Sequence, residues 1–493
     1  MTYGRLIKAI AFLALTAIAI RVSADSDTWW HLAAGRWMAA NGRLLQEDVF
    51  SFTRAGQPWV NPGWLAQLAW FAAYRILGHP GVNLLTGALA IGAYWVLWPR
   101  LQAPGLLKAF VVLLSASAAA IFWAARPHMF SFLLAAVYLA ILEDWRAGRS
   151  NRLWLLPLLM VPWVNLHGGF AIGFLLIGAY AAGAALQAAL TTAGSWPLRV
   201  RTGWESASRL LGIGALTAAA VSLNPQGPRL LAYPFQTVSI GALQDYIQEW
   251  QSPDFHAAQA QPFAWLLLIT PVALALSRRA RHATELLLYL GFGYLSLAAA
   301  RNIATFALAV IPALSRHAAD SLQRLPARPV SRPLPPRLVS AINWVLLLVV
   351  GLGTVVWVAP RLTPGFNQGA IEARLPVRAV DWLASHSLPG PLLHSYQWGG
   401  YVIWHLWPEY ATYVDGRTDL FGQGLLAEYL SVWRAEQGWQ ATVEQREFRL
   451  ALLEPGAPIA LALQAEGWQL VYQDELALVL RAPASAGTGA AAP

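Results

Sequence analysis

The sequence predicts a polytopic α-helical membrane protein with about eleven transmembrane helices, followed by a soluble extracytoplasmic α/β domain. Hydrophobic residues make up 57% of the 493 positions and charged residues only 12%. This composition implies far more apolar surface than the core of a soluble protein can bury. The second observation is a series of apolar runs of nearly membrane-spanning length. The third is a change of pattern after Pro360, where short strand-like and helix-like segments alternate. The predicted domains are therefore residues 1–360, with a first extracytoplasmic loop at 23–80, and residues 361–493.

Each apolar run is a candidate transmembrane helix. The runs lie near residues 6–22, 81–98, 106–123, 128–142, 153–166, 168–190, 207–223, 262–277, 284–300, 302–315 and 340–359. Several are shorter than the roughly 20 residues that a perpendicular helix needs, and Pro157 and Pro162 interrupt the fifth. The identity of one or two crossings therefore stays open.

The loop charges predict the orientation. With the N-terminus in the cytoplasm, most arginines and lysines of the short loops fall on the inner side, as the positive-inside rule requires. This pattern needs residues 63–77 to form a helix that lies in the outer interface without crossing. The first run is expected to be retained, because the charged segment 25–27 replaces a cleavage site. An odd number of crossings then places the C-terminal domain outside, after an Arg- and Pro-rich cytoplasmic tether at residues 316–337.

Composition also excludes some functions. The net charge of +9 is spread over short loops instead of forming one basic patch, so no nucleic-acid partner is expected. Cysteine is absent, which excludes disulfides, a thiol nucleophile and a cysteine metal cluster.

The C-terminal domain is predicted to alternate helices and strands. Helices are expected at residues 377–385, 425–434 and 458–465, and strands at 391–395, 411–414, 449–453, 468–473 and 476–481. Asp474 and Glu475 form a plausible tight turn between the last two strands. The Ala/Gly/Pro-rich tail after Arg481 is expected to be disordered.

The first loop carries two carboxylates and an imidazole next to the membrane surface. If residues 27–40 are helical, Asp27 and His31 lie one turn apart on the same face, where they can share a proton or a ligand. Together with Asp25 they also offer a possible site for a divalent metal such as Mg or Mn. The alternative for one of the two carboxylates is helix capping, but capping does not require both.

A second group of polar residues recurs at the predicted outer ends of the spans. Ionisable groups at this depth are unfavourable unless they face one another or a polar cavity, so their clustering on one face indicates a functional site. Taken singly, Arg301 is also explained by a side chain that extends to the interface, and His167 by a hydrogen bond to a carbonyl. The members of the group are Arg126, His128, Asn165, His167, Glu249 and Arg301.

Five short motifs support a family resemblance. They are Trp-Trp-His-Leu at 29–32, Asp-Val-Phe-Ser-Phe at 48–52, Asn-Leu-His-Gly-Gly at 165–169, Tyr-Gln-Trp-Gly-Gly-Tyr at 396–401 and Asp-Gly-Arg-Thr-Asp at 415–419. With the acidic first loop, they make the chain resemble a bacterial branch of the GT-C superfamily of integral-membrane glycosyltransferases. That superfamily includes protein O-mannosyltransferases, the lipid A aminoarabinose transferase and oligosaccharyltransferase subunits.

The resemblance implies a location in the bacterial inner membrane and a function. The donor would be a sugar on a polyprenyl phosphate, and the acceptor a hydroxyl of a glycan, lipid or protein at the extracytoplasmic face. A first-loop carboxylate acts as base or metal ligand in the superfamily, which makes Asp27 the first candidate and Asp25 the second, with His31 beside them. Many relatives carry an Asp-Glu pair there, whereas this chain has Asp-Ser-Asp.

The other candidates take roles around the donor and the acceptor. Arg126, Arg301 and His128 are expected to bind the donor phosphate, because guanidinium groups stay charged at low dielectric and grip phosphate through paired donors. Expected substrate-binding residues are His167, Asn165, Glu249, Tyr396, Trp398, Asp415 and Arg417. For the C-terminal residues, a tight turn and an internal ion pair are an equal alternative. Competing functions are a non-catalytic relative or a transporter of an amphipathic lipid-linked substrate.

Overall fold

A computed structural model describes the chain except for residues 194, 239–240, 242–247, 325–334 and 484–493. Two compact units are present. Unit 1 comprises Met1–Val22, Ile76–Gln236 and Gln244–Thr363, and unit 2 comprises Ser23–Arg75, Thr237–Leu243 and Pro364–Pro493. The structure thus groups most of the first loop with the C-terminal segment, whereas the sequence analysis counted that loop with the transmembrane domain.

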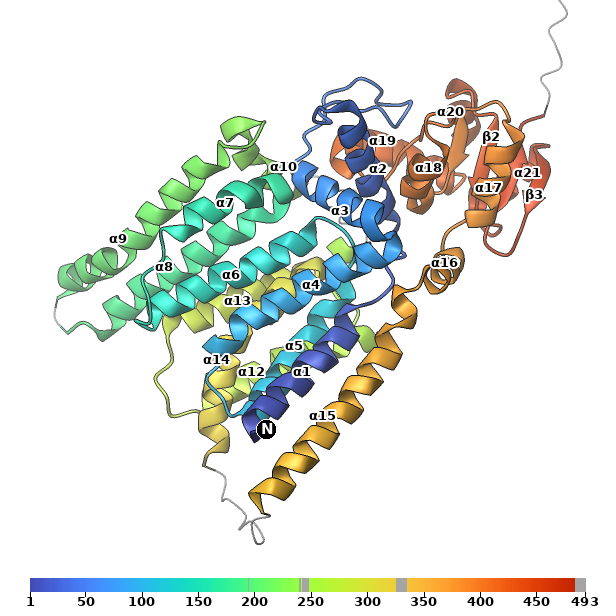
Figure 1. Ribbon diagram of the computed structural model, residues 1–493. Helices are drawn as coiled ribbons and strands as arrows, with labels where there is room; N and C mark the ends of the chain where they lie inside the picture. Colours follow the sequence, from blue (N-terminus) through green and yellow to red (C-terminus); the bar gives the residue numbers. More distant parts are fainter. Residues whose placement is uncertain (194, 239–240, 242–247, 325–334, 484–493) are drawn as a thin grey trace, which may run out of the picture. The chain divides into compact units, whose positions relative to one another are not determined.

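Unit 1 is a bundle of apolar helices (Figure 1). Its α-helices are α1 (Tyr3–Ala19), α4 (His79–Leu97), α5 (Gly105–Ala119), α6 (His128–Arg146), α7 (Leu155–Leu166), α8 (Ala171–Thr191), α9 (Trp196–Val221), α10 (Tyr233–Val238), α12 (Gln261–Leu276), α13 (Ala283–Ala298), α14 (Ile303–Leu322) and α15 (Pro336–Val358). Short 3-10 segments join or extend them: η1 (Trp98–Arg100), η2 (Ala120–Phe122), η3 (Gly168–Phe170), η4 (Gly227–Ala232), η5 (Gln248–Trp250), η6 (Ala258–Ala260), η7 (Ala300–Asn302) and η8 (Pro360–Leu362). Every apolar run identified in the sequence therefore lies in a helix.

Six helical segments of the described chain are long and apolar enough to cross a bilayer. They are His79–Arg100, Gly105–Phe122, His128–Arg146, Gly168–Thr191, Ala258–Leu276 and Pro336–Val358, and Leu155–Leu166 and Ala283–Ala298 are shorter apolar helices. In the last of the six only 6% of the apolar window is buried by protein, although its mean hydropathy is 2.2. Such a surface is stable in hydrocarbon and not in water, so the chain is a multi-pass membrane protein.

Helices α1 and α15 lie side by side and run in the same direction (Figure 1). At one end the α-amino group of Met1 donates to the Ser340 hydroxyl at 2.7 Å, and at the other the Trp357 indole donates to the Ala17 carbonyl at 3.1 Å. Their first residues therefore share one end of the bundle. A parallel first and last helix is what an odd number of crossings requires.

Two boundaries in unit 1 differ from those predicted. Helix α9 begins at Trp196 and α14 continues to Leu322, into the segment predicted as a tether. The extension of α14 has a local cause: the Asp320 carboxylate accepts hydrogen bonds from the Ser277 hydroxyl at 3.0 Å and the Arg278 amide at 2.9 Å. Residues 325–334 of the predicted tether lie outside the described residues.

Unit 2 contains a small mixed sheet covered by helices. Its helices are α2 (Ser26–Asn41), α3 (Trp64–Leu77, whose last two residues belong to unit 1), α16 (Pro364–Glu372), α17 (Val377–His386), η9 (Tyr396–Trp398), α18 (Gly399–Leu406), α19 (Thr418–Trp433), α20 (Trp439–Gln445) and α21 (Pro458–Ala465). Its strands are β1 (Leu392–His394), β2 (Leu450–Leu453), β3 (Gln469–Gln473) and β4 (Leu478–Arg481), in the order β1-β2-β4-β3. Strands β1 and β2 are parallel, with Leu392 opposite Leu450, and the other pairs are antiparallel.

The segment 411–414, predicted as a strand, does not join this sheet. Thr412 instead forms an isolated bridge with the first loop: the Phe52 amide donates to the Thr412 carbonyl at 3.0 Å, and the Thr412 amide donates to the Phe50 carbonyl at 2.9 Å. These backbone bonds join two segments that are distant in the sequence. They give one reason why the first loop and the C-terminal segment form a single unit. The predicted disordered tail, residues 484–493, lies outside the described residues.

Candidate active site

The first-loop carboxylates Asp25 and Asp27 stand at the start of α2. Asp25 is the N-cap residue, and its side chain accepts a hydrogen bond from the Asp27 amide at 2.9 Å. One carboxylate is thus used for capping, the role that the sequence analysis allowed for one of the two. Asp27 lies in the first helical turn, where its Oδ1 accepts a hydrogen bond from the Trp30 indole Nε1 at 3.1 Å. Both carboxylates are half-buried.

His31 is buried one turn after Asp27. Its ring lies 3.5 Å from the Trp30 ring centroid, and its Nδ1 lies 3.4 Å from the Gln67 side-chain nitrogen of α3. Among the residues described, no three histidine, aspartate or glutamate side chains are gathered closely enough to hold a metal ion. In this structure Asp25 caps the helix and His31 packs on aromatic and amide groups, and a metal site at Asp25, Asp27 and His31 stays a prediction.

In unit 1, Glu249 joins the two candidate phosphate-binding arginines. The Arg126 Nη2 donates to Glu249 Oε2 at 2.7 Å, and Arg301 Nη1 lies 3.7 Å from Glu249 Oε1. We call these three residues the arginine–glutamate cluster. Burial opposes ionisation of Glu249, but the two guanidinium groups outweigh it and lower the pKa of Glu249 to about 2. The Arg301 guanidinium also stacks over the Trp250 ring at 4.3 Å. The cluster therefore carries one net positive charge.

Two histidines of unit 1 lie near each other. The ring centroids of His128 and His167 are 6.4 Å apart. His167 Nδ1 accepts from the Gly169 amide at 3.1 Å and lies 2.8 Å from the Ser131 hydroxyl. Because Nδ1 acts as an acceptor, the proton of neutral His167 lies on Nε2, which makes that nitrogen a donor. His128 Nε2 donates to the Phe122 carbonyl at 2.5 Å.

Asn165 connects two helices of unit 1. Its side-chain nitrogen donates to the Val161 carbonyl at 2.8 Å and to the Leu223 carbonyl at 3.2 Å. Its side-chain oxygen accepts from the Asn224 amide group at 3.1 Å. In this structure the Asn165 amide joins the end of α7 to the end of α9, and its role in substrate binding stays a prediction.

Asp415 and Arg417 form a buried ionic network with Asp48 of the first loop. The Arg417 side chain donates to Asp415 at 2.7 and 2.8 Å and to Asp48 at 2.5 Å, and none of the three side chains is appreciably exposed. Burial opposes the charged form of Arg417, but the two carboxylates outweigh it and raise the pKa of Arg417. Of the two roles considered from the sequence, this geometry matches the internal ion pair. A sugar could reach these groups only if the network opened.

The motif at 396–401 is also packed inside unit 2. Trp398 is 4% exposed, and the Tyr396 amide donates to the Tyr429 hydroxyl at 2.7 Å. A methyl group added at Gly399 would lie 2.8 Å from the Asp415 Cβ, so the two C-terminal motifs touch each other. In this structure the Trp398 ring packs inside the unit, and substrate binding by Tyr396 and Trp398 stays a prediction.

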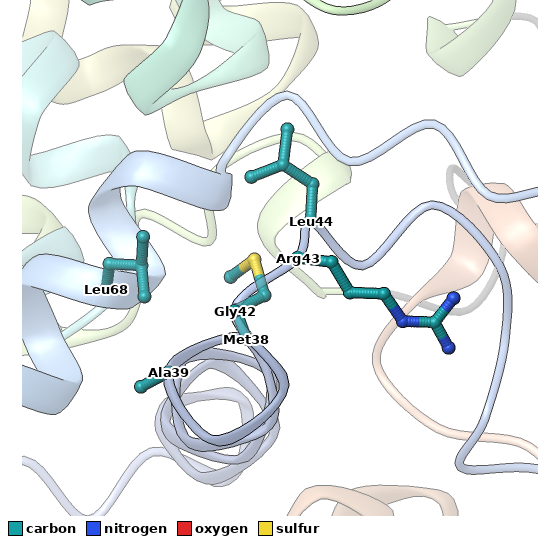
Figure 2. Close-up of a pocket in the computed structure, with 6 residues that line it drawn as sticks. All are labelled: Met38, Ala39, Gly42, Arg43, Leu44 and Leu68. Carbon is teal, nitrogen blue, oxygen red and sulfur yellow. The ribbon is translucent and has the colours of Figure 1, made fainter.

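The depression shown in Figure 2 lies at the far end of α2 from Asp27. It has a volume of about 430 Å³ and is lined by Met38, Ala39, Gly42, Arg43, Leu44 and Leu68. Eleven positions of helix separate Asp27 from Met38, which corresponds to about 16 Å. None of the candidate site residues lines this depression.

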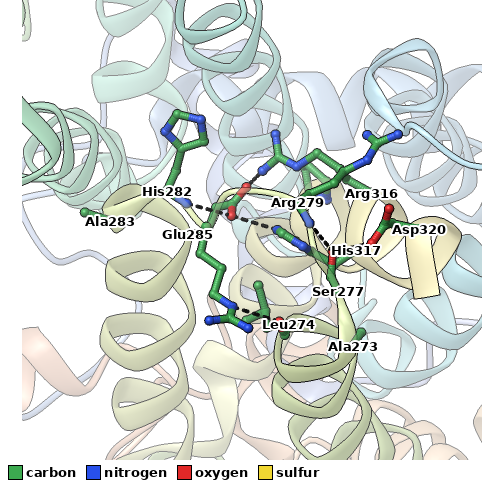
Figure 3. A network of polar contacts seen from close by, with 12 residues as sticks. Ala273, Leu274, Ser277, Arg279, His282, Ala283, Glu285, Arg316, His317 and Asp320 are labelled. Carbon is green, nitrogen blue, oxygen red and sulfur yellow. Dashed lines mark hydrogen bonds and ion pairs between the residues drawn. The ribbon is translucent and has the colours of Figure 1, made fainter. Parts of the chain in front are cut away.

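A buried polar network in unit 1 was not identified from the sequence (Figure 3). Glu285 of α13 forms an ion pair with Arg316 of α14, accepts a hydrogen bond from the His317 ring of the same helix at 3.0 Å, and lies 3.7 Å from Arg146 of α6. Glu285 is 3% exposed and His317 is fully buried. The sequence analysis interpreted the arginines here as topology signals, and Glu285 carried no motif that marked it.

Comparison with known proteins establishes the fold. No protein family model matches the chain, and no curated protein sequence matches it. Among solved structures, ArnT from Cupriavidus metallidurans bound to undecaprenyl phosphate is 14% identical with a TM-score of 0.51, and the likeness covers 98% of this chain and 99% of that chain. The chain has a GT-C fold.

Two archaeal structures give the same result. The Archaeoglobus fulgidus oligosaccharyltransferase tethered with an acceptor peptide is 11% identical with a TM-score of 0.52, over 92% of this chain and 69% of that chain. The oligosaccharyltransferase AglB of the same organism, in complex with an inhibitory peptide and a dolichol-phosphate, is 11% identical with a TM-score of 0.50, over 92% and 70%. The GT-C resemblance predicted from the five motifs is thus confirmed as a shared fold. At these identities the likeness does not by itself assign an activity.

Proposed function

We propose that this GT-C protein is an integral-membrane glycosyltransferase. It moves a sugar from a polyprenyl phosphate to an acceptor hydroxyl at the extracytoplasmic face of the membrane. One observation supports this most strongly: a likeness over nearly the whole chain to ArnT bound to undecaprenyl phosphate. AglB, of similar fold, is in complex with a dolichol-phosphate. Both ligands join an isoprenoid chain to a phosphate, which is the chemistry proposed for the donor here.

Asp27 is the proposed general base. As the acceptor oxygen bonds to the sugar C1, its proton passes to the Asp27 carboxylate, the bond from C1 to the phosphate oxygen breaks, and the electron pair leaves with the phosphate. The Asp27 carboxylate is half-buried at the start of α2, where the Trp30 indole donates to its Oδ1. Asp25 is the second choice because its carboxylate already caps α2. No step is assigned to a metal ion.

Arg126 and Arg301 are the proposed ligands of the donor phosphate. Both already contact one anion, Glu249, at 2.7 and 3.7 Å. A departing phosphate carries more negative charge than a carboxylate, and its oxygens match the paired donors of guanidinium groups. The phosphate is therefore proposed to replace Glu249 as the partner of the two arginines. The Nε2 proton of His167 is proposed as a further donor to the phosphate or the acceptor. His128, whose Nε2 proton is bound by the Phe122 carbonyl, is proposed to help position the acceptor.

The donor can be identified without knowing the acceptor. Deleting the gene is expected to cause one polyprenyl-phosphate-linked sugar to accumulate, as measured by mass spectrometry of extracted lipids. The wild-type gene should reverse this, and the Asp27→Asn variant should not, since loss of a general base lowers a rate by about 100-fold or more. Asp381→Asn, which changes an exposed carboxylate in α17, is the matched control and should restore the wild-type lipid pattern.

Binding of the lipid phosphate is tested separately. Undecaprenyl phosphate should bind the purified protein in native mass spectrometry, and Arg126→Ala or Arg301→Ala should weaken this binding by about 10-fold or more. Arg152→Ala, at an exposed arginine, is the control. If no lipid-linked sugar accumulates in the deletion strain and undecaprenyl phosphate does not bind, the transferase function is excluded. If Asp27→Asn restores the wild-type pattern, only the assignment of the base is lost.

A further inference from the structure

Two glycines of the C-terminal motifs contact the first turn of α2. A methyl group built on Gly416 would lie 2.0 Å from the Asp27 Oδ1 and 2.8 Å from the Trp30 Nε1. A methyl group built on Gly400 would lie 2.2 Å from the Ser26 carbonyl oxygen. Separations below 3 Å mean that something must shift if a side chain is added. At Gly400 the obstruction is backbone, so the turn itself would have to move, and at Gly416 it is the Asp27 carboxylate that would have to move.

The two glycines contact different parts of the first turn of α2. Gly400 lies against the backbone of the turn, since its nearest atoms are the Ser26 carbonyl and the Trp30 amide nitrogen. Gly416 lies against the side chains, namely the hydrogen-bonded Asp27 carboxylate and Trp30 indole. Gly400 thus limits where the turn can lie, and Gly416 limits where the carboxylate can point.

The segment that carries Gly416 is itself rigid. Arg417 is fully bonded to Asp415 and Asp48, and the Asp415 side chain also accepts from the Arg417 amide at 3.1 Å and from the Thr412 hydroxyl at 3.0 Å. Buried ionic bonds on both sides of Gly416 hold this turn in place. The turn therefore restricts the positions of the side chains that pack against it.

We infer that Gly416 and Gly400 are positioning residues for the Asp27 carboxylate, with Gly416 acting on its side chain and Gly400 on its helical turn. The inference rests on the proposed function, in which Asp27 is the base. It assigns a role to the two C-terminal motifs that differs from direct sugar binding: their glycines and buried charges hold a reactive group supplied by the first loop. Neither glycine touches the reacting atoms.

The central test compares Gly416→Ala with Gly424→Ala. Gly424 lies in α19 of the same unit, has no atom within 4 Å of an added methyl group, and requires no unusual backbone angle. The rate is the consumption of the accumulated lipid-linked sugar in a detergent extract of the deletion strain after purified protein is added. Gly416→Ala should lower this rate by about 100-fold, the effect expected from moving a base by about 1 Å. Gly424→Ala should change it less than twofold.

Two further measurements distinguish positioning from general loss of structure. Binding of undecaprenyl phosphate by Gly416→Ala should stay within twofold of wild type. In addition, Gly416→Ala should lower the Tm of the wild-type protein more than that of the Asp27→Ala protein, because removing the carboxylate removes the closest collision and leaves only the one with the Trp30 indole. Equal Tm losses in both backgrounds would overturn the inference.

The inference and the proposed function fail in different ways. If Asp27→Asn is inactive and Gly416→Ala keeps the wild-type rate, the positioning role is wrong and the proposed base stands. If Asp27→Asn keeps the wild-type rate, Asp27 is not the base, and the positioning role of Gly416 and Gly400 is wrong as well. Gly400→Ala should behave as Gly416→Ala does in the rate assay, but its Tm loss should persist in the Asp27→Ala protein because it collides with backbone.

Discussion

The guanidinium of Arg417 lies 2.5 Å from the carboxylate of Asp48, although 369 positions separate the two residues in the chain. Asp48 also accepts hydrogen bonds from the Phe50 and Ser51 amides at 3.1 Å, so the arginine is connected directly to the backbone of the first loop. This pair fastens the first loop to the C-terminal segment within unit 2. It explains why two motifs at opposite ends of the sequence belong to one compact unit.

Replacing Arg417 by methionine should destabilise unit 2 by about 3–5 kcal/mol, because two buried carboxylates lose their counter-ion. Denaturant unfolding of the purified full-length protein, followed by limited proteolysis, measures this loss. Arg434→Met is the control, since Arg434 pairs with Glu436 at 3.5 Å with both side chains about half exposed, and its loss should stay below about 1 kcal/mol. Similar losses in the two variants would show that the buried network does not hold unit 2 together.

Gly183 and Gly178 form a matched pair within α8. A methyl group at Gly183 would lie 2.2 Å from the Thr284 hydroxyl oxygen and 2.6 Å from its Cα, whereas one at Gly178 would meet nothing within 4 Å. Gly183→Ala should therefore force α8 away from α13 and lower the Tm of the protein in detergent. Gly178→Ala should leave the Tm unchanged or raise it, because alanine favours a helix by up to about 1 kcal/mol. Equal Tm values for the two variants would contradict this close packing of α8 on α13.

Glu285 is expected to be the most sensitive residue of the network in Figure 3. Glu285→Gln removes the anion that pairs with the buried Arg316 guanidinium inside the bundle and should destabilise the protein by about 3–5 kcal/mol. Glu205→Gln breaks an exposed pair with Arg201, and its effect should stay below about 1 kcal/mol. Thermal unfolding of both variants in detergent tests the difference, and a wild-type Tm for Glu285→Gln would show that this network does not stabilise the bundle.

The arginine–glutamate cluster should give a characteristic pH dependence. The pKa of Glu249 is lowered from 4.5 to about 2, so its ion pairs contribute stability above pH 4.5 that is lost as the pH falls towards 2. The Tm difference between wild type and Glu249→Gln should be largest above pH 4.5 and disappear near pH 2. A difference that does not change between pH 5 and pH 2.5 would show that Glu249 is not held ionised by the arginines.

The predicted orientation can be tested with reporter fusions. Alkaline phosphatase attached after residue 493 should be active and green fluorescent protein there should be dark, because the positive-inside rule places the C-terminus outside. The same reporters attached after Leu322, where the chain is expected to be cytoplasmic, should give the opposite result. Active phosphatase after Leu322 would invert the proposed topology.

Much of the helical part could be predicted from the sequence. In unit 1 each apolar run forms a helix, because lipid leaves no other way to satisfy backbone hydrogen bonds in a single segment. Helix α3 lies at the residues where the sequence predicted a helix in the outer interface, and α2 covers the segment 27–40 that was considered as a helix. The strand predicted at 411–414 was wrong, because its one bridging residue, Thr412, pairs with the first loop and not with the sheet.

The candidate site was predictable only in part. Capping by one of the two first-loop carboxylates and the grouping of Arg126 with Glu249 were predicted from residue types and their places at helix ends, and the structure assigns the cap to Asp25. The roles of Asp48 and Gly416 did not, because each depends on a partner from a distant segment and neither residue type identifies that partner. The possible metal site was inferred from Asp25, Asp27 and His31 lying close in sequence, and it stays a prediction, because capping and packing decide where such side chains point.

The sequence by itself determined that this chain enters a membrane and where its helices lie, since burial of apolar groups and local backbone bonding depend on neighbouring residues. Only the tertiary structure decided that the first loop folds with the C-terminal segment, and which carboxylates pair with which arginines. Those choices depend on close approach between distant segments, at Arg417 with Asp48 and at Gly416 with Asp27. The sequence does not identify the partner of a charged residue or of a glycine, because that partner is set by the segment that packs against it in the folded chain.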